Sequence, residues 1–316
     1  MRALVTGGAG FIGSGLVDAL LARGDEVVVL DDLSTGRRSN LDDALGRGAR
    51  LVEGDVREAA AVSSAFDDGA GFDAVFHLAA QIDVRRSVAD PRFDLDVNAG
   101  GTLQLLEAAR EAGVARFVFA STGGAIYGEG EGRDLPLDEG AERRPDAPYG
   151  QSKHAAEGYV ALYARLHGLS TASLRLANVY GPRQDPLGEA GVAAIFSGAL
   201  LAGRTPTVFG DGLQTRDYVY VEDVVDAFLA AGSATAPSGA FNVGTGAETN
   251  VLELGRAIAA AVGVPFEPEH APPRLGEVRR ISIDPSLARS ELGWGPRTSF
   301  NDGLARTVDW ARSTGG

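Results

Sequence analysis

The sequence predicts an α/β fold with a doubly wound parallel sheet, and three observations lead to this fold class. Short apolar runs alternate with helical patterns through the first half of the 316-residue chain, as they do in βαβ units. The first apolar run leads into a glycine-rich turn, from Gly7 to Gly13, that opens a helix. The second run ends in two acidic residues, Asp31 and Asp32. Together these features are typical of the first βαβ unit of such a sheet.

The elements of the first half follow in order from this alternation. The strands are predicted where short apolar runs end in turn residues, at Ala3–Thr6, Glu26–Asp31, Arg50–Gly54, Ala74–Leu78, Arg116–Ser121 and Thr171–Leu176. The helical patterns between them are Phe11–Arg23, Glu58–Phe66, Pro91–Ala112 and Pro148–His167. Because parallel strands need crossover connections, each helix is expected to link two strands of one sheet.

The two long helices, 91–112 and 148–167, carry apolar residues beyond a single stripe. These residues are Leu103, Leu105, Leu106, Tyr159, Val160, Leu162 and Tyr163. A second apolar face on paired helices predicts a homodimer interface. The alternative is that both helices are simply well buried in their own chain.

The second half of the sequence has a different texture. After Ala177, longer Gly/Pro-rich connections separate shorter elements. We therefore expect residues 1–177, joined by part of 213–245, to form one Rossmann-type domain. Residues 178–316 are expected to form a smaller α/β region that binds the substrate.

Composition excludes several classes of partner. The formal net charge of −14 disfavours nucleic acid and anionic membranes, because both would be repelled. Cysteine is absent, so disulfides and thiol chemistry are excluded. The four histidines are scattered without metal-ligand spacing, and no metal site is expected. The chain has no secretory leader pattern and no apolar run of about eighteen residues, so we expect a soluble, cytoplasmic protein.

The glycine-rich turn predicts a dinucleotide site. Glycines at positions 7, 10 and 13 permit a tight turn, close approach of a pyrophosphate and packing of helix on strand. The helix that follows offers free backbone N–H groups to phosphate. An acidic residue at the end of the second strand, Asp31 or Asp32, accepts from a ribose 2′-hydroxyl and repels a 2′-phosphate, which favours NAD over NADP. Arg37 and Arg38 are the alternative, since either is long enough to contact a 2′-phosphate, although a solvated loop suits them better.

Tyr149 and Lys153 predict proton transfer. Lys153 is the one lysine among the 29 basic side chains, and a compact ammonium can enter a crowded pocket that excludes Arg. Asp146 is expected to cap a helix with Pro148 in its first turn, which places Tyr149 and Lys153 on one face. A cation near a phenol at a helix N-terminus is expected to lower its pKa from about 10 toward neutrality, and this makes Tyr149 a general base.

Two hydroxyls complete the expected catalytic cluster. Ser121 and Thr122 end a predicted strand, at the sheet edge where ligands of this architecture bind. Hydroxyl, phenol and ammonium groups together suit removal of a proton from an alcohol while a nicotinamide accepts hydride.

Further motifs carry a resemblance that covers nearly the whole chain. The sequence resembles the extended short-chain dehydrogenases/reductases of the NAD-dependent epimerase/dehydratase family that act on nucleotide sugars, and among them the UDP-glucose (UDP-galactose) 4-epimerases. The motifs are Gly7-x-x-Gly10-x-x-Gly13, His77-Leu78-Ala79-Ala80, Tyr127-Gly128, Tyr149-x-x-x-Lys153, Leu174-Arg175-x-x-Asn178-Val179-Tyr180-Gly181-Pro182 and Arg216-Asp217-Tyr218-Val219-Tyr220-Val221-x-Asp223.

The resemblance implies residue roles. Tyr149 is implied as the base, and Lys153 as the residue that holds the nicotinamide ribose. The implied substrate contacts are Asn178 on the diphosphate, Arg216 and Arg274 on phosphate, and Glu277 on the uridine ribose, with Thr122 and Tyr149 near the sugar. With the glycine turn, the expected NAD contacts are Gly7, Gly10, Phe11, Ile12, Gly13, Asp31, Asp32, Asp55, Val56, Leu78, Ala79, Ala80, Asn98, Tyr149 and Lys153. Asp55 is equally suited to cap the helix that follows it.

Departures from the family pattern refine the expected reaction. The family's catalytic hydroxyl position is Gly123, so Thr122, with Ser121 behind it, is the nearest substitute. Dehydratases carry Asp-Glu where this chain has Gly123-Gly124, which argues against dehydration. Asp185 has the wrong sign for a uronate carboxylate, although Arg183 is close by. The position of the hexose-pocket gate is Ile281, which leaves room for N-acetylated sugars.

The combined prediction is an NAD-dependent 4-epimerase that interconverts UDP-glucose and UDP-galactose, or their N-acetyl forms, through a 4-keto intermediate. A UDP-glucuronate 4-epimerase or another UDP-uronate-modifying relative is one alternative. A non-catalytic NAD-binding regulatory protein is another, but such proteins lose the Tyr or the Lys, and this chain retains both.

Overall fold

A seven-stranded parallel sheet forms the centre of the fold in the computed structural model, which describes residues 1–67, 71–185, 191–273 and 278–314. The strand order is β11-β6-β5-β4-β1-β2-β3. The strands are β1 (Arg2–Thr6), β2 (Glu26–Asp31), β3 (Arg50–Glu53), β4 (Ala74–His77), β5 (Arg116–Thr122), β6 (Ser170–Leu176) and β11 (Gly239–Val243). The order reverses between β1 and β4, where ligands of such sheets bind. The predicted fold class is confirmed.

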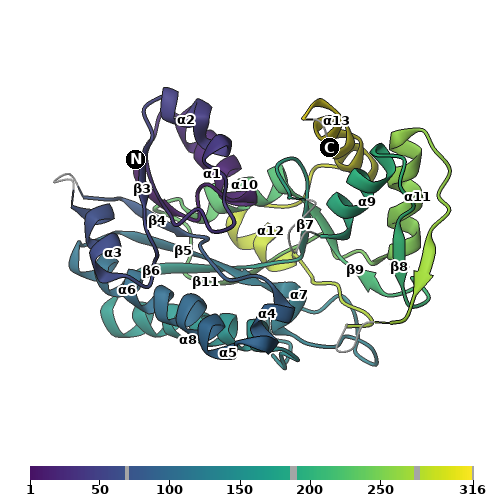
Figure 1. Cartoon of the computed structure of the whole chain (residues 1–316). Coiled ribbons are helices and arrows are strands. Elements are labelled where there is room, and N and C mark those ends of the chain that lie inside the picture. Colours follow the sequence, from purple (N-terminus) through teal and green to yellow (C-terminus); the bar gives the residue numbers. More distant parts are fainter. Residues whose placement is uncertain (68–70, 186–190, 274–277, 315–316) are drawn as a thin grey trace.

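Helices cover both faces of this sheet (Figure 1). Alternate residues of β1 enter different cores, Val5 with one face and Leu4 with the other, as the two-residue period of a strand requires. One face is covered by α1 (Phe11–Ala22), α2 (Asp42–Gly46), α10 (Val221–Ala231) and α12 (Ser286–Leu292). The other is covered by α3 (Ala59–Phe66), α6 (Gly101–Glu111) and α8 (Pro148–His167).

The helix predicted over 91–112 is not a regular α-helix. It consists of α5 (Pro91–Leu95), a π-helical turn η2 (Asp96–Gly100) and α6. Asp90 caps its start by accepting from the backbone N–H of Phe93 at 3.0 Å. Inserted π turns often occur at functional sites, and this one carries Asn98, whose contacts are described below.

The C-terminal half has a third core of its own, and its elements are grouped to one side of the central sheet (Figure 1). Its helices are α9 (Val192–Leu201), α11 (Val251–Val262) and α13 (Phe300–Ser313). Its short strand pairs are β7 (Asn178–Tyr180) with β10 (Tyr218–Tyr220), β8 (Thr207–Phe209) with β13 (Glu269–Ala271), and β9 (Thr215–Arg216) with β12 (Thr249–Asn250). The chain then returns to the first half, because α10 packs on α1 and β11 pairs with β6. The remaining short helices are η1 (Arg38–Leu41), α4 (Val84–Ala89) and α7 (Gly123–Ile126).

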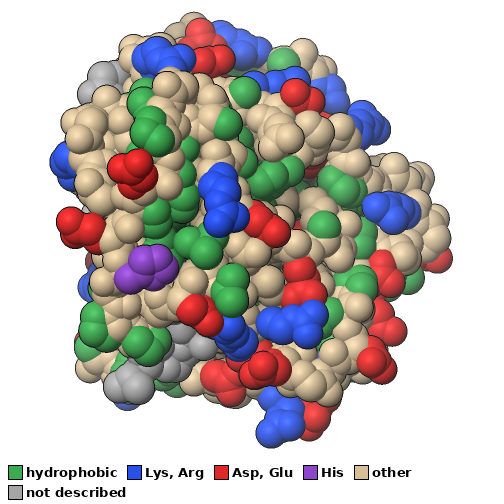
Figure 2. Space-filling model, turned by 90° about the vertical axis from the view of Figure 1, so that its right-hand side faces the viewer, with side chains coloured by type: hydrophobic (Ala, Val, Ile, Leu, Met, Phe, Trp, Pro, Cys, Tyr) green, Lys and Arg blue, Asp and Glu red, His purple; other side chains and the backbone are tan. Residues whose placement is uncertain are grey.

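The apolar residues of the long helices fall into a buried group and an exposed group. Leu105, Leu106 and Val160 are buried in the core of their own chain. Tyr159 and Leu162 remain exposed, by 41% and 36%. On the face formed by the C-terminal half, acidic and basic side chains are interspersed (Figure 2). Among the described residues, no helix is long and apolar enough to cross a membrane.

Candidate active site

Two positions in the turn between β1 and α1 accept only glycine. Gly7 has a φ of 69°, and a Cβ there would lie 2.6 Å from the backbone N of Ala79. A Cβ on Gly13 would lie 2.1 Å from the carbonyl O of Gly7. The N-cap of α1 is Gly10, which has no side chain, so no side-chain cap occupies the first N–H groups of the helix. This geometry suits a pyrophosphate.

The other predicted NAD residues around this turn lie at the carboxyl ends of β1 and β4. The side chains of Phe11 and Ile12 pack against the third core, so their backbone N–H groups are what they can offer a ligand. Leu78, Ala79 and Ala80 directly follow β4, and the N–H of Ala79 donates to Thr6 Oγ1 at 3.3 Å. Backbone groups of these residues thus lie where the strand order reverses, between β1 and β4.

Asp31 fixes the shape of this crevice. Its carboxylate accepts from the backbone N–H of Ala9 at 2.8 Å and of Leu33 at 2.9 Å. Burial raises the pKa of Asp31, and these two bonds oppose the shift. Asp32 is exposed and accepts from the N–H and hydroxyl of Ser34. Asp31 is therefore the better-placed carboxylate for a ribose.

Asp55 and Val56 follow β3. The Asp55 carboxylate does not cap α3, which begins at Ala59, but binds the Arg57 guanidinium at 2.5 Å. This hydrogen-bonded ion pair lowers the pKa of Asp55. Val56 is buried under Gly101, whose Cβ would lie 2.7 Å from it. The capping alternative is thus not what the structure shows.

Tyr149 and Lys153 lie one turn apart on α8, with Pro148 as its first residue. The predicted cap by Asp146 is wrong. The N-cap is Ala147, and the Asp146 carboxylate instead accepts from the N–H of Glu129 at 3.0 Å. Another contact supports the helix start, because the N–H of Tyr149 donates to Ser87 Oγ at 3.1 Å.

The electrostatics of this pair differ from the prediction. Burial raises the pKa of Tyr149 to about 12; the nearby Thr122 hydroxyl opposes this shift without cancelling it, and the charge of Asp94 adds to it. The prediction of a lowered phenol pKa is therefore wrong for the ligand-free protein, because desolvation outweighs the helix N-terminus. Burial also lowers the pKa of Lys153 to about 7. The Lys153 ammonium lies 4.5 Å from the centroid of the Phe119 ring.

The two candidate hydroxyls point to different partners. Thr122 is the last residue of β5, and α7 begins directly after it at Gly123. The strand gives way to a helix there, and the Thr122 hydroxyl lies close enough to the Tyr149 phenol to oppose the rise of its pKa. The Ser121 hydroxyl donates to the Glu157 carboxylate at 2.8 Å. Ser121 is therefore bonded to Glu157, and Thr122 is the better-placed candidate of the two for handling a proton.

The position where the family has its hydroxyl is crowded. A Cβ on Gly123 would lie 2.5 Å from Ile283 Cδ1 and 3.1 Å from the carbonyl O of Arg175. A serine at 123 would require Ile283 to move. The close approach of the β5–α7 turn to its neighbours thus explains why Thr122 is the available hydroxyl.

A buried ionic network behind the site was not predicted. Glu157, one turn beyond Lys153 on α8, accepts from Arg175 Nη2 at 2.5 Å and Nε at 3.1 Å. Arg175 Nη1 donates to the Tyr127 hydroxyl at 2.7 Å, which donates to Asn242 Oδ1 at 2.8 Å. Glu157 lies on the same face as Tyr149 and Lys153, and this four-residue spacing is the signal that sequence reasoning missed.

Asn98 belongs to a second buried network. Its amide donates to the carbonyl O of Gln81 at 3.0 Å, to Asp94 Oδ1 at 3.2 Å and to Ser152 Oγ at 3.0 Å. Its Oδ1 accepts from the N–H of Gln81 at 2.9 Å. The side chain is thus held by protein partners, and its contact with NAD stays a prediction. The side chain links η2 to α8.

The predicted substrate residues lie across the crevice. Asn178 begins β7, and its Oδ1 is 3.3 Å from where a Cβ of Gly124 would be. Arg216 lies on β9, with Nη1 donating to the carbonyl O of Thr215 at 2.8 Å. Arg274 and Glu277 lie outside the described residues. Asn178 is thus brought to the turn that follows Thr122.

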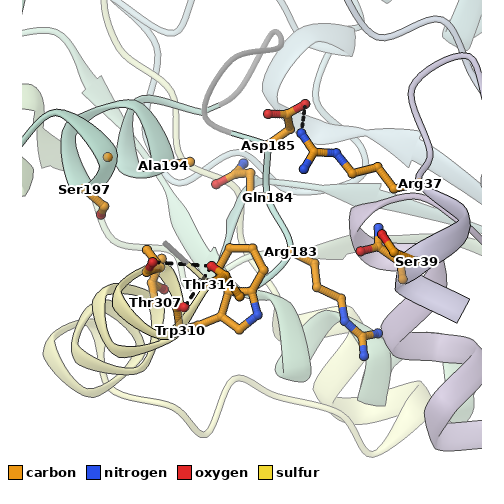
Figure 3. A pocket seen from close by; sticks show the side chains of 14 residues that line it. Arg37, Ser39, Arg183, Gln184, Asp185, Ala194, Ser197, Thr307, Trp310 and Thr314 are labelled. Carbon is orange, nitrogen blue, oxygen red and sulfur yellow. Dashed lines mark hydrogen bonds and ion pairs between the residues drawn. The ribbon is translucent and has the colours of Figure 1, made fainter. Parts of the chain in front are cut away.

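A cavity of about 440 Å³ lies at the rim between the two halves (Figure 3). Arg37 Nη2 there contacts Asp185 Oδ2 at 3.0 Å, and Arg183 Nη1 contacts Asp18 Oδ2 at 2.7 Å. Arg183 is thus paired with Asp18. Ile281 is 2% exposed and belongs to the first core.

Comparisons with known proteins agree with this geometry. The sequence profile of the NAD dependent epimerase/dehydratase family matches residues 3–244. A UDP-glucose 4-epimerase of Mycolicibacterium smegmatis is 52% identical over 99% of both chains. The crystal structure of a Thermotoga maritima UDP-glucose 4-epimerase with UDP-glucose is 44% identical, covers 100% of both chains and has a TM-score of 0.95. That of a Thermus thermophilus UDP-glucose 4-epimerase with NAD is 46% identical, covers 99% of both and has a TM-score of 0.91. The chain belongs to the NAD dependent epimerase/dehydratase family.

Proposed function

We propose that this protein is an NAD-dependent UDP-sugar 4-epimerase that interconverts UDP-glucose and UDP-galactose. One observation carries the proposal: Tyr149, with the Thr122 hydroxyl near it and Lys153 one turn away, lies at the carboxyl edge of the sheet that also carries the glycine turn and Asp31. The likeness to UDP-glucose 4-epimerases over the whole chain supports it.

NAD, when bound, supplies a hydride acceptor and donor. In this proposal the glycine turn holds the pyrophosphate and Asp31 the adenosine ribose. Tyr149 accepts the proton of the sugar 4-hydroxyl and returns it after the 4-keto sugar has turned. The phenol can act only if its pKa falls well below 12 in the complex. The Lys153 ammonium and the positive charge of an oxidised nicotinamide act in that direction.

We assign the cofactor to residues 1–177 with part of 213–245, and the nucleotide sugar to 178–316. Asn178, Arg216, Arg274 and Glu277 are the proposed contacts of the UDP moiety. Anchoring the nucleotide leaves the hexose free to turn, as an epimerase requires. Pairing of two copies through helices α6 and α8, and location in the cytoplasm, remain predictions.

The test is incubation of the purified protein with UDP-glucose and with UDP-galactose, with the product sugar measured by chromatography. We expect each to yield the other without net consumption of NAD. Parallel reactions with UDP-N-acetylglucosamine and UDP-glucuronate show which sugar the enzyme prefers. Since Arg183 is paired with Asp18, turnover of UDP-glucuronate is expected to be lower by more than about tenfold. A better rate with the uronate, or binding of NAD without any turnover, would overturn the proposal.

A further inference from the structure

Asp94 is a buried carboxylate that the proposed reaction does not use. It lies on α5 and is 0% exposed. Its Oδ1 accepts from Gln81 Nε2 at 2.7 Å and from Asn98 Nδ2 at 3.2 Å. Its Oδ2 is buried without a hydrogen-bond partner among the described residues. A carboxylate in such a position is costly unless an opposite charge compensates it.

Lys153 is the buried cation on the helix beside Asp94, since Asn98, which binds Asp94 Oδ1, also binds Ser152, the neighbour of Lys153. Helix α5 packs directly on α8, and Lys153 is 2% exposed on that helix. The charge of Asp94 raises the pKa of Lys153, against the larger effect of burial. The same charge raises the pKa of Tyr149. One carboxylate therefore acts on both members of the proposed catalytic pair.

The other titratable groups around α5 do not replace Asp94. His77 on β4 is fully buried, and burial with the charge of Lys153 lowers its pKa to about 3, so it is neutral. The guanidinium of Arg86 on α4 lies 4.1 Å from the centroid of the Phe93 ring. Asp96, on the turn after α5, is paired with Arg92 at 2.8 Å near the surface.

We propose that Asp94 is a positioning residue whose buried carboxylate is the counter-charge of the Lys153 ammonium. It acts through Lys153 and Tyr149, and its hydrogen bonds to Gln81 and Asn98 hold it in place. The inference rests on the proposed function for its effect on turnover. Its effect on the ionisation of Lys153 does not depend on that function.

The sign of the effect follows from the charges. A carboxylate stabilises a protonated amine and destabilises a phenolate. Replacing Asp94 by Asn removes the charge, while the amide oxygen still accepts from Gln81 and Asn98. The pKa values of Lys153 and Tyr149 should then both fall. The pH range in which Lys153 is charged and Tyr149 is ionised therefore moves to lower pH.

The composition of the chain allows a direct measurement. Lys153 is the one lysine in the sequence, so labelling with ¹³C-lysine gives a single side-chain signal that needs no assignment. The Lys153 titration is followed by NMR in the full chain and in Asp94→Asn, and the pH profile of kcat is measured on the same preparations. Asp96→Asn is the matched control, since it removes a carboxylate two residues away at the surface.

The expected result is a fall of the Lys153 midpoint by about one pH unit or more in Asp94→Asn, with the kcat optimum displaced to lower pH. Asp96→Asn should leave both unchanged. An unchanged Lys153 midpoint, with kcat lowered equally at every pH, would mean a purely structural role and would overturn the proposal. If Asp94→Asn does not fold, Asp94→Glu and Asp94→Gln are compared, since they differ in charge but not in size. An equal Lys153 midpoint in these two contradicts the proposal, whether or not the protein turns over UDP-sugars.

Discussion

The buried pair Glu157–Arg175 predicts a large and specific loss of stability when one charge is removed. Glu157 and Arg175 are 5% and 1% exposed. Glu157→Gln keeps the shape of the side chain but leaves the Arg175 guanidinium without its carboxylate. The Gln amide oxygen, the Tyr127 hydroxyl at 2.7 Å and the carbonyl O of Glu139 at 3.1 Å can still accept from Arg175, but none of them carries a compensating charge. Breaking a buried pair from one side typically costs about 3–5 kcal/mol.

The measurement is thermal unfolding followed by circular dichroism. Because about 2–4 °C per kcal/mol applies to chains of about 150–250 residues, the melting temperature of Glu157→Gln should fall by about 6–20 °C. Asp309→Asn is the control, because Asp309 forms an exposed pair with Arg312, and it should change little. Replacing both Glu157 and Arg175 by Met should recover most of the loss, since no uncompensated charge remains. A single variant as stable as the wild type would refute the assignment of this pair as a buried network.

Three further predictions concern the reaction. Tyr149→Phe should retain NAD but lose nearly all turnover, and more than about a tenth of the wild-type rate would argue against Tyr149 as the base. The Asp31 carboxylate is fixed at the end of β2, so calorimetry should show that NAD binds more than about tenfold tighter than NADP. Equal affinities would mean that an arginine contacts the 2′-phosphate of NADP. Thr122→Val should slow turnover by about 10- to 100-fold, whereas Ser121→Ala should lower stability more than rate. The reverse order in assays of both variants would move the proton-handling role to Ser121.

The strands of the first half were predictable because their signal is local. Each of the six predicted strands forms, since runs such as Glu26–Asp31 are β-branched, apolar and ended by turn residues. The glycines at 7 and 13 were equally readable, because close backbone approach leaves no alternative residue. The confirmed fold class rests on these local features.

The remaining features depend on tertiary contacts that no local pattern records. The π turn at Asp96–Gly100 accompanies the contacts of Asn98 with α8. The Asp146 carboxylate accepts from the N–H of Glu129 and not from the first turn of α8. The pKa of Tyr149 rises because other elements remove water from its phenol, and spacing along one helix cannot report that. Chemistry at this site therefore depends on packing as much as on motif.

The position of β11 bears on how the protein is synthesised. This strand, Gly239–Val243, completes the sheet beside β6, yet it follows β7, α9 and α10 in the sequence. A nascent chain that ends near residue 177 has an open edge at β6 and an uncovered face on α1, where α10 packs. On a ribosome-bound intermediate, both surfaces would be prone to aggregation. The first half should thus fold stably only after most of the second half has emerged.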